Sequence, residues 1–194
     1  MEQKVMESSF VHKLNEEVKL FPYQDFYPSI GKNVFLASGV KIIGNVEIGN
    51  NSSVWYNTVI RGDVHYIKIG ENTNIQDCSM LHVTNGKYPL SVANKVTIGH
   101  SVSLHGCTLN DLCLIGIGAI ILDGAVIESN SVVAAGALVK QNFVVPSGKL
   151  VVGVPARIIR DLREDEINDI EKSAKRYVEY SLITKESLKK NFNK

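Results

Sequence analysis

The sequence predicts a mainly β fold: a parallel β-helix of hexapeptide repeats, followed by one C-terminal α-helix. Three observations predict it: an aliphatic residue recurs at every sixth position, a small or β-branched residue often follows four positions later, and glycine often stands next to the aliphatic residue. This period differs from the spacing of a helix and from simple alternation, but it suits short strands that meet at corners. Three hexapeptides form one triangular coil, and coils stack about 4.8 Å apart through backbone hydrogen bonds. The alternative, a β-sandwich, would show strands of varied length.

The repeat extends over residues 30–156 and changes phase at three places. These are Tyr66 to Lys68, a polar loop near residues 84–91, and a single five-residue step before Leu109. The aliphatic residues of the repeat, which we call anchors, are expected to point into the coil. They are Ile30, Leu36, Ile42, Ile48, Val54, Ile60, Ile69, Ile75, Leu81, Val92, Ile98, Leu104, Leu109, Ile115, Ile121, Ile127, Val133, Val139, Val145 and Val151.

The segments on either side of the repeat differ from it but belong to the same structural domain. Residues 1–29 are expected to form an extended N-terminal lead-in, and residues 157–194 a C-terminal helix and tail. Residues 162–188 contain no glycine or proline, and their apolar residues recur at helical spacing. One face of this helix is therefore expected to pack against the β-helix or a neighbour. Asp161 is a candidate cap for its start.

Composition and charge disfavour several classes of protein. Lys and Arg together number 21 against 20 Asp and Glu, so nucleic acid and acidic membrane surfaces are disfavoured as partners. No apolar run approaches the roughly 18 residues that a membrane span requires, and the first residues do not resemble a signal peptide. The 3 cysteines cannot all pair within one chain. A cytoplasmic protein with reduced thiols and a small-molecule substrate is expected.

The repeat places two histidines side by side. The anchors before them, Leu81 and Leu104, fall on the same face of successive coils. His82 and His105 therefore point outward from neighbouring strands, about 4.8 Å apart at the backbone. Two imidazoles at this separation can bind one metal ion, with Zn–N distances of about 2.0–2.1 Å.

A third histidine faces elsewhere. His100 stands two positions after its anchor, Ile98, and so points away from the other two. A homotrimer around a threefold axis would bring His82 and His105 of one subunit together with His100 of its neighbour. The sequence therefore predicts a homotrimer with metal sites between subunits. Three histidines leave the fourth position of the ion open for water, as in hydrolytic or hydration centres.

Four polar residues are expected near these histidines. Gln76 lies on the face of His100, one coil earlier, where its amide is placed to hold a metal-bound water or a substrate oxygen. Arg61 and Asp63 lie one coil below His82, and a salt bridge between them at the trimer seam is the favoured interpretation. Asp77 is placed either to orient a histidine N–H or to cap a corner, and both interpretations stay open.

These residues resemble those of a known family. The stretches Val59–Asp63, Asn74–Asp77, Leu81–His82 and Gly99–Gly106 resemble the gamma-class carbonic anhydrases, and the similarity covers about residues 21–180. Members of this family are left-handed parallel β-helix trimers. The resemblance implies metal ligands at His82, His100 and His105, Gln76 beside the bound water, an interface pair of Arg61 and Asp63, and Tyr177 of the C-terminal helix near the site.

The resemblance also implies a cofactor. Zn²⁺ is expected, with Fe²⁺, Co²⁺ or Ni²⁺ as alternatives, because three imidazoles suit all of these metals. At two positions where archaeal-type members carry acidic residues for proton transfer, this chain has Val64 and Asn85. His65, Tyr177 or a direct path of water molecules is then expected to carry the proton.

The leading hypothesis for function is a metal-dependent carbonic anhydrase. It would convert CO₂ reversibly to bicarbonate with a metal-bound hydroxide at a subunit interface. One alternative is a hexapeptide-repeat acyltransferase or thioesterase that acts on acyl-CoA, with His100 or His105 as a general base and no metal. Another is a metal-binding trimer without catalytic activity.

Overall fold

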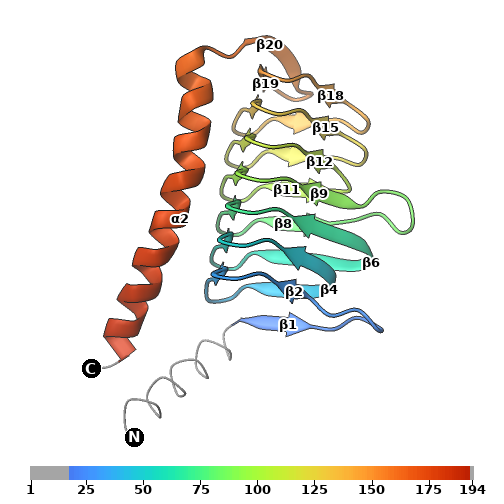
Figure 1. Cartoon of the computed structure of the whole chain (residues 1–194). Helices are drawn as coiled ribbons and strands as arrows, with labels where there is room; N and C mark the ends of the chain where they lie inside the picture. The colour runs from blue at the N-terminus through green and yellow to red at the C-terminus, as the bar shows by residue number, and fades with distance from the viewer. Residues whose placement is uncertain (1–17, 193–194) are drawn as a thin grey trace, which may run out of the picture.

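The chain folds into a parallel β-helix with a C-terminal helix beside it, so the predicted fold class is confirmed (Figure 1). The computed structural model describes residues 18–192; residues 1–17 of the predicted lead-in and residues 193–194 of the predicted tail lie outside these. Short strands pair in parallel with the strands one coil before and one coil after them. The coils have three faces, which we call the histidine face, the helix face and the third face.

The histidine face and the third face share one 12-stranded sheet, because two long strands bend from one face to the other. These strands are β4 (Lys41–Ile48) and β6 (Val59–Ile69). The other strands of the histidine face are β1 (Lys19–Phe21), β8 (Met80–His82), β11 (Ser103–His105), β14 (Ile120–Ile121) and β17 (Leu138–Val139). Those of the third face are β2 (Ser29–Ile30), β9 (Leu90–Val92), β12 (Thr108–Leu109), β15 (Val126–Ile127) and β18 (Val144–Val145).

The helix face is an 8-stranded sheet against which the C-terminal helix packs. Its strands are β3 (Phe35–Leu36), β5 (Ser53–Val54), β7 (Asn74–Ile75), β10 (Thr97–Ile98), β13 (Leu114–Ile115), β16 (Val132–Val133), β19 (Lys149–Val152) and β20 (Arg157–Asp161).

The anchors form the core, as the six-residue period predicts, except that Ile30 and Leu36 in the first coil are only partly buried. Neighbouring strands pair anchor with anchor, so that Leu81 lies between Ile60 and Leu104 on the histidine face. All three side chains are fully buried. Burial of such a side chain contributes about 1.5–3 kcal/mol. A shift of one residue would turn the anchors outward, so this register is strongly favoured.

Most of the small residues four positions after the anchors are also buried, and some of them are polar. Their hydroxyl groups donate to carbonyl groups of the next coil: Ser52 to Gly70 at 2.7 Å and Ser79 to Gly99 at 3.1 Å. Throughout the described part of the chain, no buried side-chain nitrogen or oxygen lacks a hydrogen-bond partner. These bonds link successive coils inside the triangle as well as along its faces.

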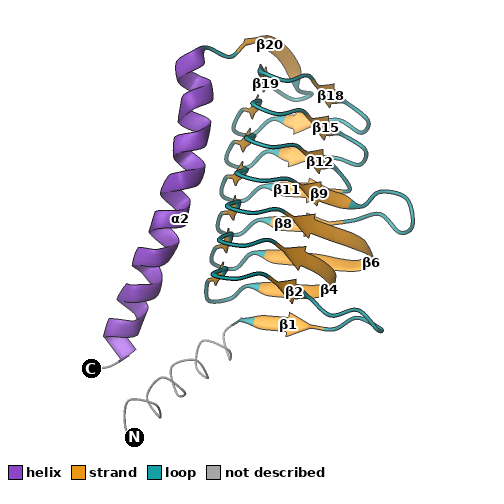
Figure 2. Cartoon of the chain, in the orientation of Figure 1, coloured by secondary structure: helices purple, strands orange, loops and turns teal. Residues whose placement is uncertain are grey.

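The C-terminal helix, α2 (Glu164–Phe192), lies along the helix face (Figure 2). Ile170 and Ala174 of α2 are buried, as the predicted apolar face requires. Lys95 of the β-helix forms an ion pair with Glu171 of α2, at 3.1 Å between Nζ and Oε1. Among the described residues, no helix is long and apolar enough to cross a lipid bilayer.

The prediction that Asp161 caps α2 is wrong. Asp161 ends β20, which turns back to pair antiparallel with β19, and its side chain forms an ion pair with Lys149. Without β20, the outer edge of β19 would expose unpaired backbone N–H and C=O groups. β20 forms hydrogen bonds with these groups. The helix begins at Glu164, where the carboxylate of Glu166 accepts the backbone N–H of Arg163 at 2.9 Å.

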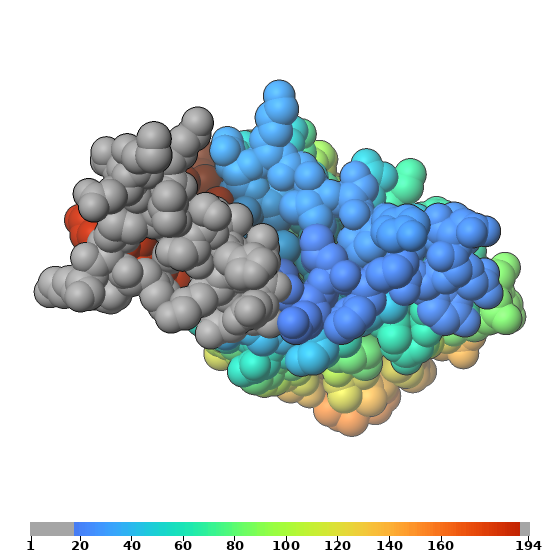
Figure 3. All heavy atoms as spheres, turned by 90° about the horizontal axis from the view of Figure 1, so that it is seen from below, coloured from blue at the N-terminus to red at the C-terminus, as the bar shows by residue number. Residues whose placement is uncertain are grey.

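The other end of the β-helix begins before the repeat does. β1 pairs in parallel with β4, and Leu20 lies opposite Ile42. Figure 3, which looks at this end from below, shows the residues from β1 onward in blue across the end of the β-helix. Between β8 and β9 a loop leaves the coils and projects to one side (Figure 1).

Candidate metal centre

His82 and His105 lie side by side, as predicted. They end the neighbouring strands β8 and β11 and stand opposite each other in the register. Because the preceding anchors point inward, both imidazoles point outward. His82 Nδ1 and His105 Nε2 are 3.0 Å apart. Two nitrogen ligands of a tetrahedral zinc ion stand about 3.3 Å apart, since each Zn–N bond is about 2.0–2.1 Å. The pair therefore fits two positions on one metal ion.

Two carboxylates orient the two imidazoles. Asp63 Oδ1 lies 3.1 Å from His82 Nε2, and Asp123 Oδ1 lies 2.7 Å from His105 Nδ1. An ionised carboxylate can only accept, so each imidazole donates an N–H to its aspartate. The other nitrogen of each ring then carries a lone pair, and these two lone pairs face each other. A cation between them stabilises this arrangement, and a carboxylate behind each ligand is the usual support of metal-binding histidines.

The surroundings of His82 keep this residue in the neutral form that binds a metal. Burial lowers the pKa of His82, with further lowering by the charges of Arg61 and His105, against the opposing effect of Asp63. Burial on its own would raise the pKa of Asp63, but hydrogen bonds from Arg61 and His82 lower it overall. Asp63 is therefore ionised and His82 is neutral at neutral pH. The predicted ion pair of Arg61 and Asp63 forms within this chain.

Asp123 is a site residue that the sequence reasoning missed. The register places Ile121 opposite Leu104, so Leu122 follows opposite His105. Asp123 is one position further along, at the corner, and reaches His105 diagonally. A search for polar residues one coil later and one position away from a predicted ligand would have found it.

His100 lies apart from the pair, as predicted, at the corner that follows β10. Its Nδ1 is 2.6 Å from Asp77 Oδ2, and Asp77 Oδ1 accepts the backbone N–H of Tyr56 at 3.1 Å. Both interpretations of Asp77, as a partner of a histidine and as a cap of a corner, therefore stay open. With its proton on Nδ1, toward the carboxylate of Asp77, His100 carries its lone pair on Nε2. Within residues 18–192, no three histidine, cysteine, aspartate or glutamate side chains gather closely enough to hold a metal ion. One chain therefore supplies the pair in one place and His100 in another.

A pocket of about 420 Å³ lies in front of His100, between the β-helix and α2. Tyr177 of α2 lines it and packs edge-on against Trp55, with the ring centroids 5.7 Å apart. Burial raises the pKa of Tyr177, and the nearby charge of Asp77 raises it further. Tyr177 therefore belongs to the surroundings of His100. The pocket is lined by Trp55, Tyr56, Asp77, His100, Tyr177, Tyr180, Ile183 and Thr184.

Gln76 lies one coil before His100 on the helix face, as predicted. Its backbone N–H donates to the carbonyl of Ile98 at 2.9 Å, and its side chain is 5% exposed. The side-chain amide donates to Asn74 Oδ1 at 3.2 Å. Asn74 in turn donates to Thr97 at 2.9 Å. Gln76 is thus fixed in a polar network next to Asp77, and its role toward a bound water stays a prediction.

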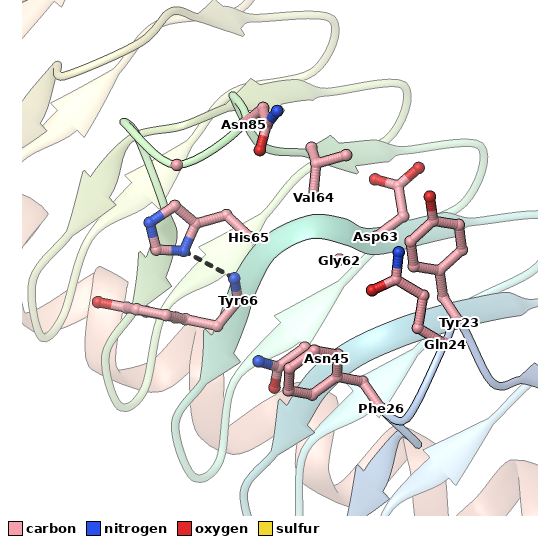
Figure 4. Close-up of a pocket in the computed structure, with 11 residues that line it drawn as sticks. Tyr23, Gln24, Phe26, Asn45, Gly62, Asp63, Val64, His65, Tyr66 and Asn85 are labelled. Carbon is pink, nitrogen blue, oxygen red and sulfur yellow. Dashed lines mark hydrogen bonds between the residues drawn. The ribbon is translucent and has the colours of Figure 1, made fainter.

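A second pocket, of about 550 Å³, lies beside Asp63 (Figure 4). Val64 and Asn85, the positions that the resemblance assigns to acidic residues, both line it, and so does His65. His65 Nδ1 accepts the backbone N–H of Tyr66 at 2.9 Å. Figure 4 shows the imidazole of His65 at the opposite side of the pocket from Asp63. Asp63, which contacts His82, therefore lies at one side of this pocket, and the imidazole of His65 lies at the other side.

Comparison with known proteins decides the family. Residues 27–62 match the family described as bacterial transferase hexapeptide (six repeats). The chain is 51% identical to a probable carbonic anhydrase of Methanocaldococcus jannaschii, over 78% of this chain and 95% of that protein. It is 42% identical to the mitochondrial gamma carbonic anhydrase 2 of Arabidopsis thaliana, over 93% of this chain and 68% of that protein. The chain belongs to the gamma carbonic anhydrase family.

A solved structure agrees with this assignment at the level of the fold. A hexapeptide transferase family protein from Anaplasma phagocytophilum superposes with a TM-score of 0.81 and is 44% identical, over 86% of this chain and 97% of that one. The identities to the two carbonic anhydrases confirm the resemblance inferred from the sequence.

Proposed function

We propose that this chain is a metal-dependent carbonic anhydrase, which hydrates CO₂ reversibly to bicarbonate. One observation carries the proposal. His82 and His105 face each other across 3.0 Å, and each is held from behind by a carboxylate. This arrangement fits two ligands of one metal ion and leaves room for a third. Zn²⁺ is the proposed ion, with Fe²⁺, Co²⁺ and Ni²⁺ as alternatives.

The third ligand is proposed to be His100 of a neighbouring subunit in a homotrimer. Two features support this. His100 keeps a free Nε2 while Asp77 holds its Nδ1. Around its pocket, Tyr56, Tyr180 and Ile183 are 37%, 45% and 60% exposed. Large apolar side chains gathered around one site are typical of a surface that a partner covers. The ion pair of Arg61 and Asp63 is proposed to lie at the seam between subunits.

The chain's own residues perform the remaining tasks of the reaction. A divalent ion on three neutral histidines supplies hydroxide at neutral pH, because it lowers the pKa of a bound water to about 7. Asp63 and Asp123 keep the imidazoles of their histidines oriented, each with an N–H toward its carboxylate and a lone pair toward the other ring. The amide of Gln76 is proposed to hold an oxygen of the substrate. The proton that is released leaves toward solvent through His65, through Tyr177 or through water molecules.

The test combines activity with subunit mixing. Stopped-flow CO₂ hydration is measured on the zinc-loaded and iron-loaded protein and on the variants His82→Ala and His100→Ala, each of which is expected to lose activity. The two inactive variants are then expressed together. If each site takes His82 and His105 from one chain and His100 from another, random mixing restores about one quarter of the sites. No recovery would contradict a shared site, and no activity of the wild type would contradict the reaction.

The alternative is an acyltransferase or thioesterase that acts on acyl-CoA. The 44% identity to a hexapeptide transferase family protein is the observation that supports it. This alternative predicts turnover of acyl-CoA without stoichiometric metal, so elemental analysis and an acyl-CoA assay separate it from the first proposal. A third outcome, bound metal without turnover of either substrate, would identify a non-catalytic metal-binding trimer. The cytoplasmic location expected from the sequence stays a prediction.

A further inference from the structure

Asp123 uses its two carboxylate oxygens for two different partners. Oδ1 accepts the N–H of His105 at 2.7 Å, and Oδ2 accepts the hydroxyl of Thr84 at 2.9 Å. Thr84 belongs to the loop that projects between β8 and β9 (Figure 1). A loop residue is therefore connected to one of the two histidines of the pair through a single carboxylate.

The loop itself is held in place by Tyr88. Two backbone hydrogen bonds close the loop: the N–H of Thr84 donates to the carbonyl of Tyr88 at 3.1 Å, and that of Tyr88 returns to Thr84 at 3.3 Å. The side chain of Tyr88 lies across the corners of the following coils. A Cβ at Gly106 would stand 2.6 Å from Tyr88 Cβ, and one at Gly124 would stand 2.9 Å from Tyr88 Cε1. Glycine at both corners is what allows this close approach.

His82, the other histidine of the pair, is supported by a similar arrangement. Asp63 holds His82 and is itself held by Arg61. Each histidine thus has a carboxylate, and each carboxylate has a second partner that fixes its orientation. In one case the second partner is a charged side chain on the same strand. For Asp123 the second partner is the neutral hydroxyl of Thr84, which lies on a loop. This hydrogen bond therefore depends on the position of that loop.

We propose that Asp123 and Thr84 are positioning residues for His105, and that Tyr88 docks the loop that carries Thr84. This rests on the proposed metal site. With its second oxygen held, the carboxylate of Asp123 cannot rotate away from His105 Nδ1. The imidazole then keeps its proton on Nδ1 and its lone pair on Nε2, directed at His82. The loop between β8 and β9 thereby controls the affinity of the site for its metal ion.

Metal affinity of the assembled protein tests the proposal. Metal-free protein is titrated with Co²⁺ and Zn²⁺ against a competing chelator, and the visible spectrum of the Co²⁺ form is recorded. Asp123→Asn is expected to weaken binding about 10–100-fold and to alter the Co²⁺ spectrum, because the ligand loses its anionic acceptor. Thr84→Val, which keeps the shape, is expected to weaken it about 2–10-fold, the range of one hydrogen bond. Thr84→Ser keeps the hydroxyl and is expected to restore the wild-type affinity.

Asp111→Asn is the matched control. Asp111 is another corner carboxylate, which accepts the backbone N–H of Asn94 at 2.8 Å. Its substitution is expected to leave the metal affinity and the spectrum unchanged, even where the thermal midpoint falls. Wild-type affinity and spectrum in Asp123→Asn would overturn the proposal, and so would equal losses in Asp111→Asn. A wild type that binds no metal overturns the proposed site and the positioning role together. Metal binding without CO₂ hydration overturns only the proposed reaction, since the affinity ratios still decide the role of Asp123.

Discussion

Tyr177 of α2 packs edge-on against Trp55 of the helix face, with an interplanar angle of 83° and ring centroids 5.7 Å apart. This contact connects the C-terminal helix to the wall of the pocket in front of His100. Edge-to-face pairs of aromatic rings contribute about 0.5–1.5 kcal/mol beyond their buried area. The contact therefore fixes α2 at the level of the candidate site, and it depends on the ring of Tyr177 rather than on its hydroxyl.

The two contributions of Tyr177 can be separated by substitution. Tyr177→Phe keeps the ring and is expected to change the free energy of unfolding by less than about 1 kcal/mol, whereas Tyr177→Ala is expected to lower it by about 2 kcal/mol. Trp55 is the 1 tryptophan of the chain, so its fluorescence reports the docking of α2 during denaturation. If the hydroxyl takes part in the reaction, Tyr177→Phe lowers the rate of CO₂ hydration at unchanged stability. A full rate in Tyr177→Phe would restrict Tyr177 to packing.

The three cysteines are expected to differ sharply in reactivity. Cys78 is exposed, whereas burial raises the pKa values of Cys107 and Cys113 to about 12. Because the thiolate is the reactive form, a thiol reagent at pH near 8 is expected to modify one cysteine in the folded protein and all of them after unfolding. Cys78→Ser is the control, and it is expected to remove the fast reaction. Ser101 occupies the same corner one coil later with a similar φ, 55° against 58°, so serine fits there.

Gly106 is expected to be the more sensitive of two corner glycines. Both Gly106 and Gly118 have positive φ, +51° and +67°. At Gly118 a Cβ meets nothing within 4 Å, so Gly118→Ala is expected to cost only the left-handed backbone penalty, about 1–2 kcal/mol. At Gly106 a Cβ would also collide with Tyr88 and Asp123. Thermal unfolding of the two variants checks this, and an equal loss of stability would contradict the close docking of Tyr88.

The parts of the site that follow the period could be predicted from the sequence. His82 and His105 stand one position after anchors that pair in register, so burial of the anchors fixes the direction of both side chains. The position of His100, two places past an anchor, follows from the same rule. The period of six thus determines the positions of His82, His100 and His105. A shift of one residue in the register would expose every anchor, so burial of the anchors excludes such a shift.

The parts that depend on corners and loops could not be predicted in this way. Asp123 reaches His105 diagonally, from a position that the register does not place opposite it. Thr84 stands in the loop where the repeat is interrupted, so the six-residue period does not place it beside Asp123. The helix start was misplaced for a related reason: β20 covers the last edge of the sheet, and a helical pattern does not reveal that need.

The pH dependence of the helix start can be predicted from Glu166. Its pKa is lowered to about 2, first by hydrogen bonds from Arg160 and then by the backbone N–H of Arg163. A carboxyl group whose pKa is lower in the folded state stabilises the fold above its unfolded pKa, about 4.3, and loses this contribution as the pH falls toward 2. Glu166→Gln is therefore expected to lower the melting temperature at pH 7 and to match the wild type near pH 2. Glu164→Gln in the same turn is the control for the negative charge at a helix N-terminus, and it is expected to have the smaller effect. Parallel melting curves of the wild type and Glu166→Gln across this whole pH range would show that the ion pair with Arg160 does not stabilise the start of α2.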